Sequence, residues 1–455
     1  MTRVSACCVS PAAAVLGCAL CFTALAHGAP TPAPSRPDPA QPSAEQRTLT
    51  TETWREPEVP VQPHLALLYV PEMGLRLVLT PLLPVVAFAE AHRVDRRIHD
   101  FVTNRERTAL LLPVVVILSR DGAGAGLRYK HTNLRGSGER LELAAVMKTN
   151  LDREVSFAYA EKLPTLDGRS LGGQLLYDVD HNDRYYGIGN DTHRRDERLL
   201  AITTYAAQVS FELGGPATDL ASFGSDVTGR FLREGLAPGT GHAPGVQASD
   251  DAALIPPAFQ RTIDYAELSW FFRHDLRDTL GRTHRGTLFE LDLHGTSDLN
   301  GEGLNAAKAT GSATGFIPVA PMHRVFVLSL GVAGATPWSS ASEIPLHTLP
   351  TLGRTTRLRG YAKGRFRDRA AWWSTVEYRY PVFDFDDTGV GLSSTLFVDV
   401  GRVGGGVREL TQTPVRVSAG AGLRGESAEG FIFRGQVGFS EEGVEFTFTL
   451  NDAPP

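Results

Sequence analysis

Residues 394–402 read STLFVDVGR and alternate apolar with mostly polar side chains at a period of two. The aliphatic side chains fall on one face, and the opposite face holds Thr395, Phe397, Asp399 and Gly401. Successive side chains of a β-strand point to opposite sides of the sheet. The segment therefore predicts a half-buried strand whose polar face carries a carboxylate.

The same alternation recurs from about residue 111 to residue 450, for example in TLFELDLH (287–294), TVEYRYP (375–381) and GVEFTFTL (443–450). In TVEYRYP, Glu377 and Arg379 lie opposite the valine and the tyrosines. Two all-β architectures fit such strands. A soluble sandwich buries the apolar faces, whereas a transmembrane barrel turns them to lipid and keeps polar groups inside.

The lengths of the connections favour the barrel. Tight connections are expected near 133–138, 163–169, 214–217, 275–284, 335–340, 383–388 and 427–429. Long ones are expected at 181–197, 233–260, 297–320, 350–370 and 403–413, all at one end of an up-and-down sheet. Short turns on one rim and long loops on the other are typical of outer-membrane barrels. The prediction is a sixteen-stranded antiparallel transmembrane β-barrel over 111–450, with its weakest strands near 218–232 and 341–349.

The N-terminal region predicts export. Residues 1–26 resemble a signal peptide cleaved after Ala26, although acylation of Cys18 in VLGC is an alternative. Residues 27–63 form a proline-rich linker, 64–110 an amphipathic helical segment, and 451–455 a short tail. All four cysteines lie in the first 21 residues, so a mature product contains none. The expected location is the outer membrane of a Gram-negative envelope.

No sequence motif indicates an enzyme or a cofactor. The H-E-x-x-H and Walker A patterns are missing from the sequence, and the one G-x-S-x-G match, GRSLG at 168–172, lies between a tight connection and a strand and not at a strand-to-helix turn. GAGLRG at 420–425 matches a dinucleotide fingerprint but lies among strands, and DVDHND at 178–183 lacks the glycine of a calcium loop. The net charge of −6 does not favour nucleic acid as a partner. We therefore expect no cofactor, no metal site and no nucleic-acid partner.

The segment TRLRGYAKGRFRD, residues 356–368, is strongly cationic. If it stays outside, its cations are solvated or bind lipopolysaccharide. If it folds into the barrel, Arg359 needs an acceptor, and alternation places Glu377 and Asp399 on the lumen-facing side. An arginine fork binds carboxylates bidentately, and Gly360 and Tyr361 suit close packing on the wall.

Several motifs together resemble the barrel of the BamA/TamA family, the bacterial surface antigen superfamily. They are LRGY (358–361), EYRYP (377–381), FVDVG (397–401), the turn in RYKHTNLRGSGERLEL (128–143) and YYGIGNDT (185–192). The resemblance implies a lumen-inserted loop with the motif Arg359, Gly360 and Tyr361. It also implies that Glu377, Phe397, Asp399 and Gly401 are its contacts on the barrel wall.

The family resemblance implies a mechanical function without covalent chemistry. A weak seam between the first strand (about 112–119) and the last (about 443–450) would open and template the strands of client outer-membrane or secreted proteins. Lipid and lipopolysaccharide of the outer membrane are further expected partners. Members that insert or export proteins usually carry POTRA domains, and none is expected in residues 27–110. A passive pore or structural barrel, or a lipid-modifying enzyme, therefore stays open as an alternative.

Overall fold

The computed structural model describes residues 103–106, 108–118, 122–149, 152–162, 169–214, 222–236, 261–279, 282–319, 324–353, 357–385, 390–412, 414–427 and 430–450. The predicted signal peptide, linker and tail lie outside these residues. So does most of the predicted helical segment, but its last residues form a turn and the start of the first strand instead of a helix. In the described part of the chain, no helix has the length and apolar character needed to cross a membrane.

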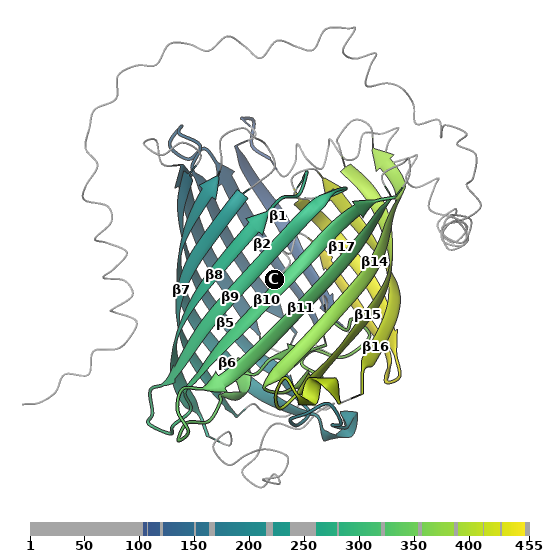
Figure 1. Ribbon diagram of the computed structural model, residues 1–455. Helices are drawn as coiled ribbons and strands as arrows, with labels where there is room; N and C mark the ends of the chain where they lie inside the picture. The colour runs from purple at the N-terminus through teal and green to yellow at the C-terminus, as the bar shows by residue number, and fades with distance from the viewer. Residues whose placement is uncertain are drawn as a thin grey trace, which may run out of the picture. The chain divides into compact units, whose positions relative to one another are not determined.

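The described strands close into an antiparallel barrel in which every strand pairs with its neighbours in chain order (Figure 1). The barrel strands are β1 (Ala109–Leu118), β2 (Gly122–Thr132), β3 (Arg140–Lys148), β4 (Arg153–Lys162), β5 (Arg169–Tyr185), β6 (Arg198–Gly214), β7 (Ser222–Leu236), β8 (Ile263–Asp275), β9 (Gly286–Asp298), β10 (Ala306–Pro318), β11 (Val325–Pro337), β14 (Ala370–Phe385), β15 (Val390–Gly404), β16 (Arg416–Ser427), β17 (Gly430–Ser440) and β18 (Gly443–Leu450). The prediction of a sixteen-stranded barrel is confirmed.

Side chains alternate between lipid and lumen as the sequence pattern predicts. Val376 on β14 and Val398 on β15 are 47% and 46% exposed on the outside, whereas Glu377 and Asp399 are buried. A transmembrane barrel has this arrangement because only apolar side chains tolerate the hydrocarbon. The polar groups of the inner faces form hydrogen bonds and ion pairs with one another or with a segment inserted into the lumen.

Between β9 and β14 one strand was not predicted and one predicted strand is wrong. Residues 306–318, expected within a long loop, form β10. Its outward positions before Ile317 are alanines and glycines, so its sequence AAKATGSATGFIP shows little apolar alternation. Conversely, 341–349 is not a strand, and the tight connection expected at 335–340 lies instead between β10 and β11, at 319–324. The two errors cancel in the strand count.

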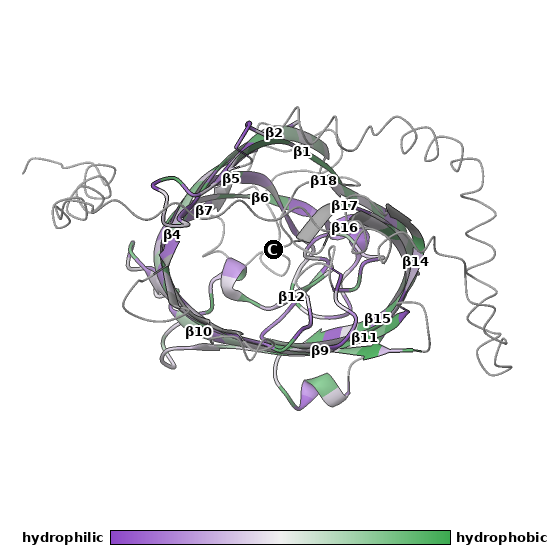
Figure 2. Cartoon of the chain, turned by 90° about the horizontal axis from the view of Figure 1, so that it is seen from above, coloured by the Kyte–Doolittle hydropathy of each residue, from purple (hydrophilic) through white to green (hydrophobic). Residues whose placement is uncertain are grey.

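The longest connections emerge on the rim that bears the β5–β6, β7–β8, β11–β14 and β15–β16 loops. The largest is the segment 338–369 between β11 and β14, which we call the lumen loop. It contains the 3-10 helix η6 (Leu346–Thr348) and a two-stranded sheet of β12 (Thr351–Leu352) and β13 (Phe366–Arg367). Viewed along the barrel, this segment crosses the interior instead of projecting outward (Figure 2). The lumen loop is the feature that positions the candidate site.

Candidate functional site: the anchored lumen loop

The lumen loop is anchored to β15 by Arg359. Its Nε donates to Asp399 Oδ2 at 3.0 Å and its Nη2 to Asp399 Oδ1 at 2.8 Å. The Arg359 backbone N–H also donates to Asp399 Oδ2, at 2.9 Å. Thr375 Oγ1 donates to the same carboxylate at 3.0 Å and Ser418 Oγ at 3.4 Å, so Asp399, at 1% exposure, is hydrogen-bonded on both oxygens. A buried charge with all its partners supplied is stable, whereas one left alone costs several kcal/mol.

Glu377 on β14 is the second acceptor of the same guanidinium. Arg359 Nη1 donates to Glu377 Oε2 at 2.6 Å. Arg379 and Arg424 donate to the other oxygen, Oε1, at 2.6 and 3.2 Å. Burial opposes the charge on Arg359, but the two carboxylates outweigh it and raise the pKa of Arg359 above its ordinary value. The guanidinium therefore joins the loop to two adjacent strands.

Gly360 lets the loop backbone lie directly against the wall. A Cβ at Gly360 would lie 2.6 Å from the Phe439 carbonyl oxygen and 2.8 Å from Ser418 Cβ. A Cβ at Gly438 on β17 would in turn lie 2.5 Å from the Arg359 carbonyl oxygen. The preceding residue, Leu358, has a φ of 52° and is fully buried. Such a conformation is unfavourable for leucine and is maintained by surrounding contacts.

The other residues of the predicted motif lie around this anchor. The Phe397 ring is beneath Arg359, with Cζ of the arginine 3.4 Å from the ring centroid. The Tyr361 hydroxyl donates to the Val417 carbonyl at 3.3 Å, and its ring packs edge-on against Phe366 at 5.1 Å. A Cβ at Gly401 would lie 3.1 Å from Leu352 of the loop. The structure brings all seven predicted residues together.

Three further cations of the loop reach other parts of the lumen wall. Lys363 pairs with Asp180 and Asp183 on β5. Arg367 donates to Asp183 Oδ2 at 3.0 Å, and Arg365 pairs with Glu442, between β17 and β18, at 2.7 Å. These three cations therefore face the lumen and not lipopolysaccharide, whereas Arg369 is exposed. The loop spans the interior from β5 to β17.

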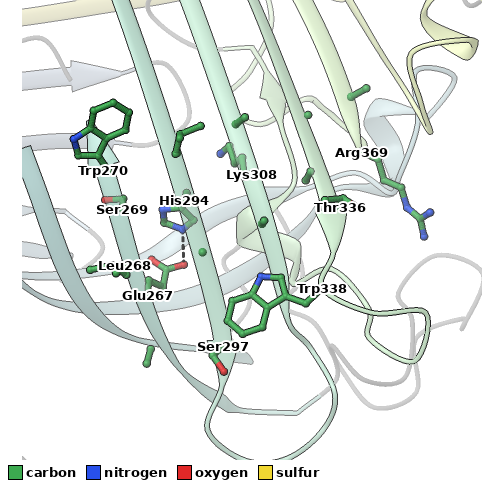
Figure 3. Close-up of a pocket in the computed structure, with 18 of the residues that line it drawn as sticks. Glu267, Leu268, Ser269, Trp270, His294, Ser297, Lys308, Thr336, Trp338 and Arg369 are labelled. Atoms are coloured by element: carbon green, nitrogen blue, oxygen red, sulfur yellow. Dashed lines mark hydrogen bonds and ion pairs between the residues drawn. The ribbon is translucent and has the colours of Figure 1, made fainter. Parts of the chain in front are cut away.

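A second buried anchor fixes the η6 end of the loop. His347 Nδ1 lies 2.8 Å from Glu234 Oε2 on β7, and its Nε2 lies 2.9 Å from Glu267 Oε1 on β8. The His294 ring on β9 also meets Glu267 Oε1, at 2.9 Å (Figure 3). Burial alone would lower the pKa of His347, but the carboxylates of Glu234 and Glu267 raise it to about 9. The imidazole is therefore a cation at neutral pH and forms ion pairs with Glu234 on β7 and Glu267 on β8.

Sequence reasoning missed this second anchor and the additional partners of the first. Alternation could have placed Glu234 and Glu267 on lumen faces, but nothing in the sequence around His347 marks it as their partner. Arg424 and Ser418 lie on the polar face of VRVSAGAGLR (415–424), whose register against β15 only the structure supplies.

Within the described residues, no group of histidines, cysteines and carboxylates is arranged to hold a metal ion. The cluster around Arg359 contains two carboxylates and three guanidiniums joined by ion pairs and hydrogen bonds. These contacts attach a polar segment to the barrel wall.

Comparison with known proteins gives a family. The Omp85 superfamily domain matches residues 133–442, which confirms the resemblance found in the motifs. The barrel of BamA from Haemophilus ducreyi lacking POTRA domains 1-3 is similar, with 17% identity and a TM-score of 0.52 over 75% of this chain and 70% of that chain. CdiB from Escherichia coli aligns with 10% identity and a TM-score of 0.49 over 75% of this chain and 62% of that chain. No curated protein matches the sequence significantly. Since the family domain covers well over half of the sequence, the chain belongs to the Omp85 superfamily of outer-membrane β-barrels.

Proposed function

We propose that this chain assists the insertion or translocation of proteins at the outer membrane by pairing client strands at the junction of β1 and β18. The proposed process is mechanical and involves no covalent chemistry. Membership of the Omp85 superfamily and the fold shared with BamA support the proposal. The observation that carries it is the short ladder at this junction.

The seam between β1 and β18 is much shorter than the other ladder of β1. β18 pairs with β1 only from Val115↔Leu450 to Leu118↔Thr447 among the described residues, whereas β2 pairs with all of β1 from Ala109 to Leu118. Fewer interstrand hydrogen bonds therefore have to be broken to part β1 from β18 than to part β1 from β2. The seam is therefore where the barrel opens at the lowest cost.

The start of β1 is the part of the edge where we place the client. Thr103 bridges Leu110, and Asn104 N–H donates to the Ala109 carbonyl at 2.9 Å. The described ladder between β1 and β18 begins at Val115, beyond this part of the strand. Pro113 has no N–H, so it cannot donate to a neighbouring strand. A client strand with exposed backbone groups would pair with this edge by β-augmentation.

The lumen loop would stabilise the C-terminal side of the seam while it opens. Ser440 Oγ donates to the Gly360 carbonyl at 2.7 Å, and Arg365 holds Glu442, so the loop contacts the hairpin of β17 and β18 directly. Since Arg359 ties the loop to β14 and β15, β18 would stay in place and β1 would move. In this role the loop residues position the seam; they are Arg359, Gly360 and Tyr361. Their contacts on the barrel wall are Glu377, Phe397, Asp399 and Gly401.

Export would require the N-terminal region. In our proposal residues 1–26 are a signal peptide, 27–63 a linker and 64–102 an amphipathic segment preceding the barrel. Intact-mass measurement of the protein purified from outer membranes should give a mature chain starting at His27. A mass that retains the first 26 residues would contradict this part of the proposal.

Reconstitution tests the function. Proteoliposomes containing the chain should accelerate the folding of a urea-denatured small barrel protein, followed by its heat-modifiable migration on a gel. Steady ion conductance without acceleration would show a passive pore, and released fatty acid would show a lipid-modifying enzyme. Either of those results would overturn the proposal.

A further inference from the structure

The outer face of β10 forms the floor of a groove. Its lipid-facing residues before Ile317 are all small: Ala307, Ala309, Gly311, Ala313 and Gly315. A Cβ added at Gly311 or Gly315 would meet no atom within 4 Å, so the space above them is open. The flanking strands carry large outward side chains, among them Leu293 on β9 and Leu330 on β11, which are 41% and 55% exposed.

The groove widens toward the long-loop rim into a depression with a volume of about 1020 Å³. Its lining is mainly apolar and includes Leu268, Trp270 and Trp338 (Figure 3). Leu293 and Ala309 also line it. The Trp338 ring lies over Gly295, where an added Cβ would be 3.6 Å from ring atom Cζ2. An exposed tryptophan directly after the end of a strand, as Trp338 is after β11, is typical of the membrane–water interface, where lipid headgroups begin.

A cation lies at the mouth of the groove. Arg369 lines the depression and is exposed at the start of β14. No carboxylate of the described residues forms an ion pair with its guanidinium, in contrast to Arg359, Arg365 and Arg367 of the same loop. An arginine at the headgroup level of the membrane fits a phosphate, which it binds through a planar fork of donors.

The width of the groove decides which occupant fits. β9 and β11 flank one strand, so their backbones are about 10 Å apart, and their side chains narrow the space further. A helix with its side chains is about 10–12 Å wide and does not fit. One hydrocarbon chain does, and the outer leaflet supplies such chains together with phosphate.

We propose that the β10 groove binds one acyl chain of lipid A, the phosphate-bearing anchor of lipopolysaccharide, and that Arg369 binds the phosphate. This inference rests on the outer-membrane location and not on the insertion activity. Failure of the client-folding assay would leave it intact, and failure of lipid binding would leave the proposed function intact.

Native mass spectrometry of the full chain tests the site, with hexa-acylated lipid A carrying two phosphates or none as probes. The wild type should retain one phosphorylated lipid A. Gly311→Val, which fills the groove, should weaken the binding of both probes about tenfold, whereas Arg369→Gln should weaken only the phosphorylated one by about the same factor. Ala309→Leu is the second groove-filling variant should Gly311→Val fail to fold.

Matched controls are present on the same barrel. Ala419→Val adds bulk to the lipid face of β16, away from the groove, and Arg195→Gln removes an exposed arginine in the β5–β6 loop on the long-loop rim. Both should bind lipid A as the wild type does. Equal lipid A binding by Gly311→Val and Ala419→Val would contradict the proposal that the β10 groove binds the acyl chain. Equal wild-type affinity for both probes would overturn the phosphate contact. A wild-type dimer that Gly311→Val dissociates would assign the surface to a second copy instead.

Discussion

Arg359 and Asp399, forty residues apart in the sequence, are joined by two side-chain hydrogen bonds of 3.0 and 2.8 Å and a third from the Arg359 backbone. The guanidinium also lies over the Phe397 ring and reaches Glu377. One residue of a polar loop thereby engages two strands of the wall. Its removal leaves two buried carboxylates with fewer partners, and this asymmetry determines the first prediction.

Arg359→Ala and Asp399→Ala should each lower the free energy of loop opening by about 3–5 kcal/mol. The double variant should be little worse than either single one, because the residues form one unit. Hydrogen exchange of residues 357–368 reports this opening free energy. Arg359→Lys is the matched control, which keeps the charge but loses the fork. Additive effects of the two alanine substitutions would mean that the pair does not form.

Gly360→Ala should weaken loop docking by about 1–3 kcal/mol, because the new Cβ would overlap the Phe439 carbonyl and Ser418. Gly406→Ala is a control of the same chemistry, since a Cβ there meets no atom within 4 Å. Protease sensitivity of the lumen loop in detergent compares the two. Equal sensitivity would show that close approach at Gly360 does not matter.

The His347 anchor should weaken in alkaline solution. Its pKa is raised to about 9 from an ordinary 6.5, so its contribution to stability is full below about pH 6.5 and is lost as the pH rises through 9. The loss is on the order of 3 kcal/mol for a buried group of this kind. Hydrogen exchange of residues 346–349 should therefore accelerate between pH 7 and 10 beyond the intrinsic chemical rate.

His347→Gln replaces the imidazole with a polar side chain that does not titrate, and it is the control for that experiment. Its loop should open more readily at neutral pH and show little further change up to pH 10. An alkaline response as large as that of the wild type would assign the titration to another group.

The barrel and the first anchor were predictable, whereas the second anchor was not. Period-two alternation in residues 375–381 and 394–402 placed Glu377 and Asp399 inward because a strand has only two faces. β10 was not predicted by the same reasoning, since alanine and glycine at most of its lipid-facing positions give little apolar contrast with serine and threonine. His347 escaped because its partners lie on β7 and β8, and only the three-dimensional path of the loop brings them together.

A reversible lock across the seam tests the central claim most directly. Val116 and Thr449 are opposite each other on β1 and β18, and residues 22–455 contain no cysteine that would compete with a disulfide between Val116→Cys and Thr449→Cys. Thr314→Cys with Ser329→Cys, between β10 and β11, is the matched control. We predict that oxidation of the seam pair abolishes accelerated folding of the client in proteoliposomes, that reductant restores it, and that the control pair has no effect. Undiminished acceleration by the oxidised seam variant would contradict the account.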